Sequence, residues 1–137
     1  MFTGPIEDRM QIRDLIDAYT DAVHQRDAAA WADTWTEDAL WDLGAGEIKG
    51  RANLVAAWVK AMENYSFVAF DGHPGMINVY GARADLRTYT SEFLIGTDGT
   101  TTAIKGQYDD RLVKEAGRWR FQSRRYTVRH RKSEAPA

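Results

Sequence analysis

The segment Ile12–Trp41 constrains the fold more than any other part of the chain. Apolar residues recur at helical spacing along its first half and just before it, which predicts one buried helix face: Met10, Ile12, Leu15, Ile16, Tyr19, Ala22 and Val23. Asp27 is typical of an N-cap and predicts a short second helix over Ala28–Thr34. A turn at 36–38 and a strand over Ala39–Leu43 should follow. The segment therefore predicts a helix pair that packs on a sheet.

The second half of the chain has the pattern of antiparallel strands. A second long helix is expected from Ala52 to about Tyr65, and β-type alternation begins near Ser66. Asp71–Gly75 is expected to be a loop, and hairpins should turn at Gly81, at Asp98-Gly99 and near Gly117. The order predicts an α+β fold, with helices packed on a strongly bent, mostly antiparallel sheet that forms a conical cavity. One domain should cover residues 1–137, with its core at about 8–130 and a flexible tail at 131–137.

Composition excludes several classes of protein. The 137 residues include no cysteine, which removes disulfides and thiol chemistry, and the net charge of −2 gives no general attraction to nucleic acid. No apolar run reaches the ~20 residues of a membrane span, and the N-terminus lacks the apolar core of a signal peptide. The expected partners therefore include neither nucleic acid nor a membrane, and the expected location is the cytoplasm.

Four stretches resemble the SnoaL-like family, within the cone-fold superfamily of nuclear transport factor, scytalone dehydratase and ketosteroid isomerase. They are Tyr19–Trp31 with its His24 and Asp27, Glu37–Asp42, Gly46–Arg51, and Gly106–Phe121. The resemblance implies a bent sheet around a conical cavity for a small hydrophobic ligand, with no cofactor. Activities in this superfamily include dehydration, polyketide cyclisation, double-bond isomerisation and epoxide hydrolysis, and some members are non-catalytic subunits of ring-hydroxylating dioxygenases.

Four residues are candidates for acid/base chemistry in such a cavity, because burial shifts the pKa of a titratable group. Tyr19 lies on the predicted buried face, where its phenol would either donate to a substrate carbonyl or serve as a core residue. His24 stands where many relatives have a catalytic Asp, and would act as a base or simply interact with the helix terminus. His73 is near the position of a catalytic histidine in scytalone-dehydratase-like members. A cluster of His24, His73 and Asp71 is too unspecific to predict a metal.

Glu92 is the fourth candidate, in the polar strand Arg87–Glu92. Alternation places Arg87, Tyr89 and Ser91 on one face and Thr88, Thr90 and Glu92 on the other. Glu92 would be a general base if its face lines the cavity, and an ion-pair residue if it does not. Further residues expected to line the ligand pocket are Trp35, Trp41, Trp58, Tyr89, Tyr108, Asp110 and Arg125.

These observations favour a cofactor-free dehydratase, cyclase or isomerase that acts on a small hydrophobic carbonyl or polyketide-like substrate. The alternative is a non-catalytic ligand-binding module or the small subunit of a ring-hydroxylating dioxygenase. Epoxide hydrolysis would need Arg87 between Asp42 and Asp110. Self-association is expected because a bent sheet exposes its convex face, first as a homodimer and second as a trimer.

Overall fold

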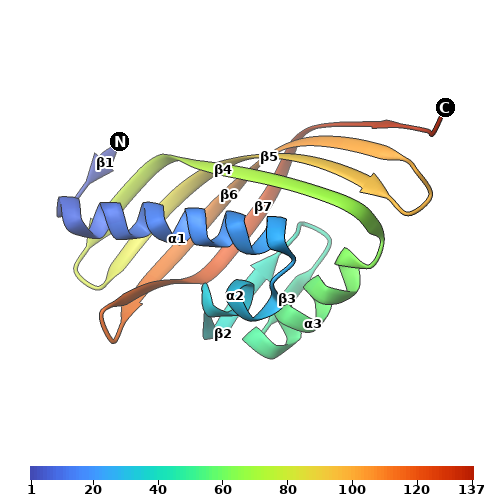
Figure 1. The fold of residues 1–137 in the computed structure, drawn as a ribbon. Coiled ribbons are helices and arrows are strands. Elements are labelled where there is room, and N and C mark those ends of the chain that lie inside the picture. The colour runs from blue at the N-terminus through green and yellow to red at the C-terminus, as the bar shows by residue number, and fades with distance from the viewer.

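The computed structural model describes residues 1–137 and confirms the predicted fold class. Seven strands form one curled sheet in the order β1-β4-β5-β6-β7-β2-β3. Figure 1 shows α1 lying along one face of the sheet, with α2 and α3 at the end where α1 finishes. Adjacent long strands pair antiparallel, whereas β1 joins β4 and β2 joins β7 in parallel. The helices thereby close a cone whose wall is the sheet.

The elements follow one another without a break into a second unit. They are β1 (Phe2–Thr3), α1 (Ile6–Gln25), α2 (Ala28–Asp33), β2 (Trp35–Asp42), β3 (Glu47–Lys49), α3 (Arg51–Met62), β4 (Tyr65–Tyr80), β5 (Arg83–Gly96), β6 (Thr101–Glu115) and β7 (Arg118–Glu134). None of the helices combines the length and the apolar character that crossing a membrane requires.

Helix α1 buries the predicted face, with the exception of Met10, which is exposed near the start of the helix. Asp27 caps α2 as expected, because its Oδ1 accepts a hydrogen bond from the backbone N–H of Ala30 at 3.0 Å. Arg26 adopts a left-handed conformation at the end of α1 and donates to the carbonyl oxygens of Met62 and Tyr65. These bonds fix the end of α1 against the junction of α3 and β4.

The loop expected at Asp71–Gly75 is absent, because β4 is continuous through this segment. The register shifts once, between Pro74 and Met76, so the glycine-rich sequence makes a bulge rather than a turn. A side chain on Gly75 would collide with the ring of Tyr89 on the neighbouring strand. The glycine is therefore explained by the close approach of this ring.

Two further boundaries differ from the sequence prediction. Strand β2 begins at Trp35, and the segment expected to be a turn is an irregularity inside it, since Trp35 pairs with Phe121 and Leu40 with Ser123. The tail predicted to be flexible from residue 131 instead continues β7 to Glu134. Its backbone pairs with β6, and the hydroxyl groups of Thr102 and Ser133 lie 3.0 Å apart.

Candidate functional site

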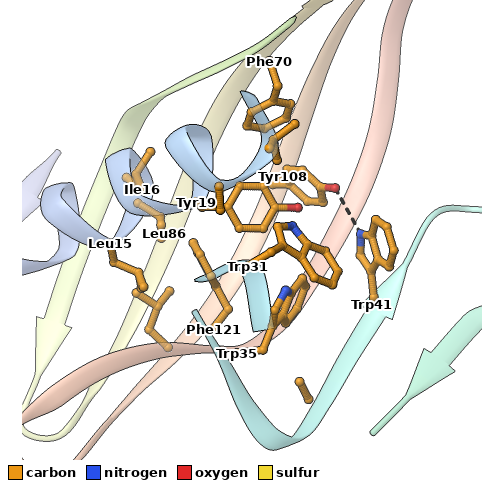
Figure 2. Close-up of a cluster of buried hydrophobic side chains, with 14 of the residues drawn as sticks. Leu15, Ile16, Tyr19, Trp31, Trp35, Trp41, Phe70, Leu86, Tyr108 and Phe121 are labelled. Atoms are coloured by element: carbon orange, nitrogen blue, oxygen red, sulfur yellow. Dashed lines mark hydrogen bonds between the residues drawn. The ribbon is translucent and has the colours of Figure 1, made fainter. Parts of the chain in front are cut away.

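An aromatic cluster lies between α1, α2 and the sheet (Figure 2). The ring of Tyr19 is centred 5.9 Å from that of Trp31 and 5.7 Å from that of Phe121. Trp31 stacks on Trp58 with ring centres 4.8 Å apart and an angle of 9°. Trp35, predicted to line the ligand pocket, is fully buried within this cluster and is not among the residues that line the cavity described below. The cluster forms a rigid floor for the space above it.

A fully buried ion pair supports the same cluster from the sheet. Arg124 Nε donates to Asp110 Oδ1 at 2.8 Å, its Nη2 donates to Oδ2 at 3.2 Å, and Thr88 donates to Oδ2 at 2.9 Å. The guanidinium carbon lies 4.5 Å from the ring centre of Tyr19 and 3.8 Å from that of Tyr108. Burial alone would lower the pKa of Arg124, but the adjacent Asp110 carboxylate raises it above its ordinary value. Arg124 is therefore a permanent cation beneath two phenol rings.

A β-bulge explains why simple strand alternation would wrongly place Arg125, and not Arg124, on the inward face of β7. Leu112 pairs with Phe121 and Arg111 pairs with Ser123, so Gln122 is an extra residue in β7. The bulge reverses the alternation after Phe121 and turns Arg124 inward. Arg125 instead points outward, where its Nη1 donates to Asp42 at 2.8 Å and to Glu47 at 3.3 Å.

Arg125 and Asp110, both predicted to line the ligand pocket, are not among the residues that line the cavity described below. Arg125 has a side chain that is 55% exposed and does not line the cavity. Asp110 faces inward but lies below the cavity wall, where Arg124 and Thr88 occupy its oxygens. Asp42 is held by Arg125, and Arg87 lies on the outer face of β5. The arrangement needed for epoxide hydrolysis is thus not assembled.

Above the aromatic floor lies a cavity of about 230 Å³ between α1, α3 and strands β4 to β7. Its lining is almost entirely apolar: Tyr19, Val23, Trp41, Leu43, Trp58, Ala61, Met62, Tyr65, Val68, Phe70, Leu94, Ile104, Tyr108 and Tyr126. Two charged residues complete it, Glu92 and Arg131. A cavity of about 150 Å³ lined by apolar residues holds benzene, so this space suits a one-ring molecule.

Glu92 is the titratable group most strongly affected by the cavity. It shares the inward face of β5 with Thr88 and Thr90, which answers the question that alternation left open. Its carboxyl group has no hydrogen-bond partner in the protein, and burial raises its pKa from 4.5 to about 7, with Arg131 acting in the opposite direction. A carboxyl group with such a pKa exchanges a proton readily near neutral pH.

Four tyrosines share the cavity with Glu92: Tyr19, Tyr65, Tyr108 and Tyr126. Tyr108 accepts a hydrogen bond from Trp41 Nε1 at 3.1 Å, which leaves its own O–H free to donate. Figure 2 shows the hydroxyl groups of Tyr19 and Tyr108 directed toward the same side of the cluster. Burial raises the pKa of Tyr19 and of Tyr108, so both remain neutral donors at physiological pH. Tyr126 lies across Gly106, where any side chain would collide with the phenol.

The two histidines predicted to be catalytic lie outside the cavity. His24 Nε2 is 2.7 Å from the carbonyl oxygen of Phe70 and 3.2 Å from its backbone nitrogen, so the imidazole fastens the end of α1 to β4. His73 lies in β4 and pairs with Tyr89 of β5, and their rings are centred 6.1 Å apart. Tyr89, predicted to line the pocket, is on the outer face beneath Arg129 and does not line the cavity.

Among the remaining predicted residues, Tyr19, Glu92, Trp41, Trp58 and Tyr108 do line the cavity. The polar residues of β7 that the sequence prediction missed are Arg124, which lies against the phenol rings, and Tyr126 and Arg131, which line the cavity. All three follow the bulge at Gln122, and a second register shift lies between the Lys105 and Gly106 pairs. No group of three His, Cys, Asp or Glu residues is placed to hold a metal ion.

A second, wider groove of about 420 Å³ lies between α1, α2 and the β6–β7 turn. Its titratable residues are all exposed: Asp14, Asp21, Asp33 and Arg118. Asp33 is already paired with Arg118 and Arg120. The cavity around Glu92 is therefore the better candidate site.

A model of the SnoaL-like domain matches residues 5–125 of the chain. The chain therefore belongs to the SnoaL-like family. No curated protein matches it.

Three solved structures show how widely this fold is shared. A protein from Novosphingobium aromaticivorans, provisionally described as an aromatic ring hydroxylase, has 26% identity, a TM-score of 0.85 and coverage of 96% of both chains. Another from N. aromaticivorans DSM 12444, provisionally described as a scytalone dehydratase, has 16% identity and a TM-score of 0.85, over 96% of this chain and 93% of that one. Hexachlorocyclohexane dehydrochlorinase LinA-type3 from Novosphingobium barchaimii has 19% identity and a TM-score of 0.81, over 95% and 92%.

Proposed function

We propose that the protein is a cofactor-free enzyme that moves a proton on a small hydrophobic carbonyl compound. The observation that supports this most strongly is Glu92, a carboxyl group without a hydrogen-bond partner in an otherwise apolar cavity, with a pKa raised to about 7 by burial. Desolvated carboxyl groups of this kind serve as general bases at neutral pH. A purely structural carboxylate would instead be paired, as Asp110 is with Arg124.

In the proposed reaction, Glu92 removes a proton from the carbon next to the substrate carbonyl. The electron pair of the broken C–H bond forms an enolate, whose oxygen accepts a hydrogen bond from the O–H of Tyr108. Trp41 holds this phenol in place and polarises it by donating to its oxygen. Return of the proton from Glu92 to another carbon completes an isomerisation. Loss of a β-hydroxyl group from the enolate, which leaves as water with the proton held by Glu92, completes a dehydration. Attack of the enolate on a second carbonyl forms a carbon–carbon bond and an alkoxide that takes this proton, which completes a cyclisation.

The family supports this class of chemistry. The chain matches the SnoaL-like domain, and its fold is shared with proteins described as a dehydratase and a dehydrochlorinase. Both names denote eliminations, which require the removal of a proton from carbon. Glu92 is the base that we assign to this step here.

The test is exchange of the α-hydrogens of cyclic ketones in D2O, followed by proton NMR. We expect the wild-type protein to accelerate the exchange, and Glu92→Gln to lose about 10²–10⁴-fold of that acceleration, the usual contribution of a positioned general base. Glu115→Gln changes an exposed carboxyl group at the far end of β6 and is the matched control. Equal exchange by wild type and Glu92→Gln would contradict the assignment.

The same exchange measurements separate catalysis from binding alone. A ligand-binding module, or a small subunit of a ring-hydroxylating dioxygenase, would bind ketones in the cavity and leave their exchange rates unchanged. The accessible volume above the aromatic floor supports binding under either function.

We also infer self-association through the outer face of the sheet. Phe67 and Phe93 meet on this face, with exposures of 48% and 42%, and their ring centres are 6.5 Å apart. Covering them with a second copy would remove apolar area from water. Light scattering after size exclusion should give twice the monomer mass of 15.5 kDa, or three times that mass for a trimer. A monomer would contradict this inference.

A further inference from the structure

We propose that the substrate carries a carboxylate, and that Arg131 binds this group at the mouth of the cavity while the reacting carbon lies beside Glu92. This inference rests on the proposed function, and it names the class of substrate: a small cyclic keto acid rather than a neutral ketone.

The first observation is the position of Arg131 in the sheet. Glu92 of β5 pairs with Ile104 of β6, and Ile104 pairs with Arg131 of β7. Phe70 of β4 completes this row across four strands, and all four residues line the cavity. Neighbouring strands lie about 4.8 Å apart, so the backbones of Glu92 and Arg131 are separated by about 10 Å. The two side chains therefore enter the cavity from one row, so that one small molecule in the cavity can contact both.

The second observation is that Arg131 has no partner of its own. Most other arginines of the C-terminal hairpin are held by carboxylates: Arg118 and Arg120 by Asp33, Arg124 by Asp110, and Arg125 by Asp42 and Glu47. Arg131 makes neither an ion pair nor a hydrogen bond, although its side chain lines an otherwise apolar cavity. Arg131 lowers the pKa of Glu92 through its charge, but the two side chains form no ion pair. The guanidinium is therefore free to meet an anion.

The third observation concerns the chemistry of the anion. An arginine fork matches the two oxygens of a carboxylate, and the paired hydrogen bonds fix the orientation of the ligand. Arg131 is exposed, so the ligand can reach it from solvent without an opening movement. Glu92 lies in the same row and carries part of a negative charge at neutral pH, which disfavours ligands with two charges. A monocarboxylate satisfies both conditions.

Calorimetric titration with matched ligand pairs tests the proposal. The probes are 3-oxocyclohexane-1-carboxylate against its primary amide, and benzoate against benzamide, so that each pair differs in charge and hardly in shape. We expect the wild-type protein to prefer each carboxylate by about tenfold, the value of one charge-assisted hydrogen bond at an exposed site. Arg131→Met, which keeps an apolar stem, should abolish the preference and leave amide binding within twofold. Arg131→Lys should retain part of it.

Arg129→Met is the matched control, since Arg129 is in the same strand but lies over the outward-facing ring of Tyr89. Its ligand preference should equal that of the wild type. Equal or better binding of the amides by the wild type would overturn the proposal, as would a preference that survives in Arg131→Met or a failure of both pairs to bind. Failure of the proposed function looks different: the carboxylate preference would be present, but the keto acid would show no Glu92-dependent exchange in D2O.

Discussion

Replacing Asp110 by Asn should destabilise the protein by about 3 kcal/mol. The substitution keeps the shape of the side chain but removes the charge opposite Arg124, whose side chain is 1% exposed. Breaking a buried ion pair costs about 3–5 kcal/mol, because one charge stays in the interior without compensation. The lower end of this energy range applies here, since Thr88 and one N–H of Arg124 can still form hydrogen bonds with the amide of Asn. The aromatic rings around the guanidinium also stabilise the cation. In a domain of this size the loss corresponds to a fall in Tm of about 10 °C.

Urea unfolding followed by tryptophan fluorescence measures this free energy at a fixed protein concentration. Asp42→Asn is the control, because it breaks an ion pair to Arg125, which is 55% exposed, and should cost less than about 1 kcal/mol. Replacing the pair together, as Asp110→Asn with Arg124→Met, should cost clearly less than the sum of the single changes. If Asp110→Asn were no more destabilising than Asp42→Asn, Arg124 would have to be hydrated, and the reasoning from a fully buried ion pair would be refuted.

Three further predictions concern individual side chains. Burial raises the pKa of Glu92 from 4.5 in the unfolded chain to about 7 in the folded protein, so the free energy of unfolding of the wild type should fall between pH 5 and 8 by up to about 3 kcal/mol. Urea unfolding at several pH values should show a flatter profile for Glu92→Gln. A parallel decline in this variant would refute the assignment of the pH dependence to Glu92. Gly106→Ala should displace the ring of Tyr126 and weaken ligand binding, measured by calorimetry, while Tm changes little. Unchanged affinity would show that Tyr126 does not shape the cavity. Asp27→Ala should cost about 1 kcal/mol by removing the cap of α2, a loss that Asp27→Asn should largely avoid.

The helices and hairpin turns could be predicted from the sequence because their signals are local. The buried face of α1 follows from apolar spacing, and Asp27 caps α2 through a bond three residues away. Gly81, Gly99 and Gly117 adopt positive φ angles where the hairpins turn, a conformation that glycine tolerates best.

The site depends on which face of each strand turns inward, and local sequence patterns do not determine this. Alternation groups Glu92 with Thr88 but is silent on which face turns inward, and only packing against α1 decides this. The bulge at Gln122 reverses the phase of β7, so Arg124 rather than Arg125 enters the core. No composition signal in Gln122 or its neighbours marks the bulge.

Gly72 and Gly75 led to the incorrect prediction of a loop at Asp71–Gly75. Glycine and proline commonly punctuate turns, but here they allow side chains of β5 to approach the backbone of β4 closely. The long strand that results places Phe70 in the cavity and His73 on the outer face, which removes the histidine from the site.

The most direct test of the central claim is a carboxyl-carbon NMR titration of protein labelled with [13C]glutamate, in which the resonance missing from Glu92→Gln identifies Glu92. We expect a midpoint of about 7 for this resonance, well above the ordinary value of 4.5. A carboxylate ligand bound at Arg131 should move the midpoint further upward, since a second negative charge disfavours ionisation. A midpoint near 4.5 in the free protein would show that Glu92 is solvated or paired, and would contradict its role as the base.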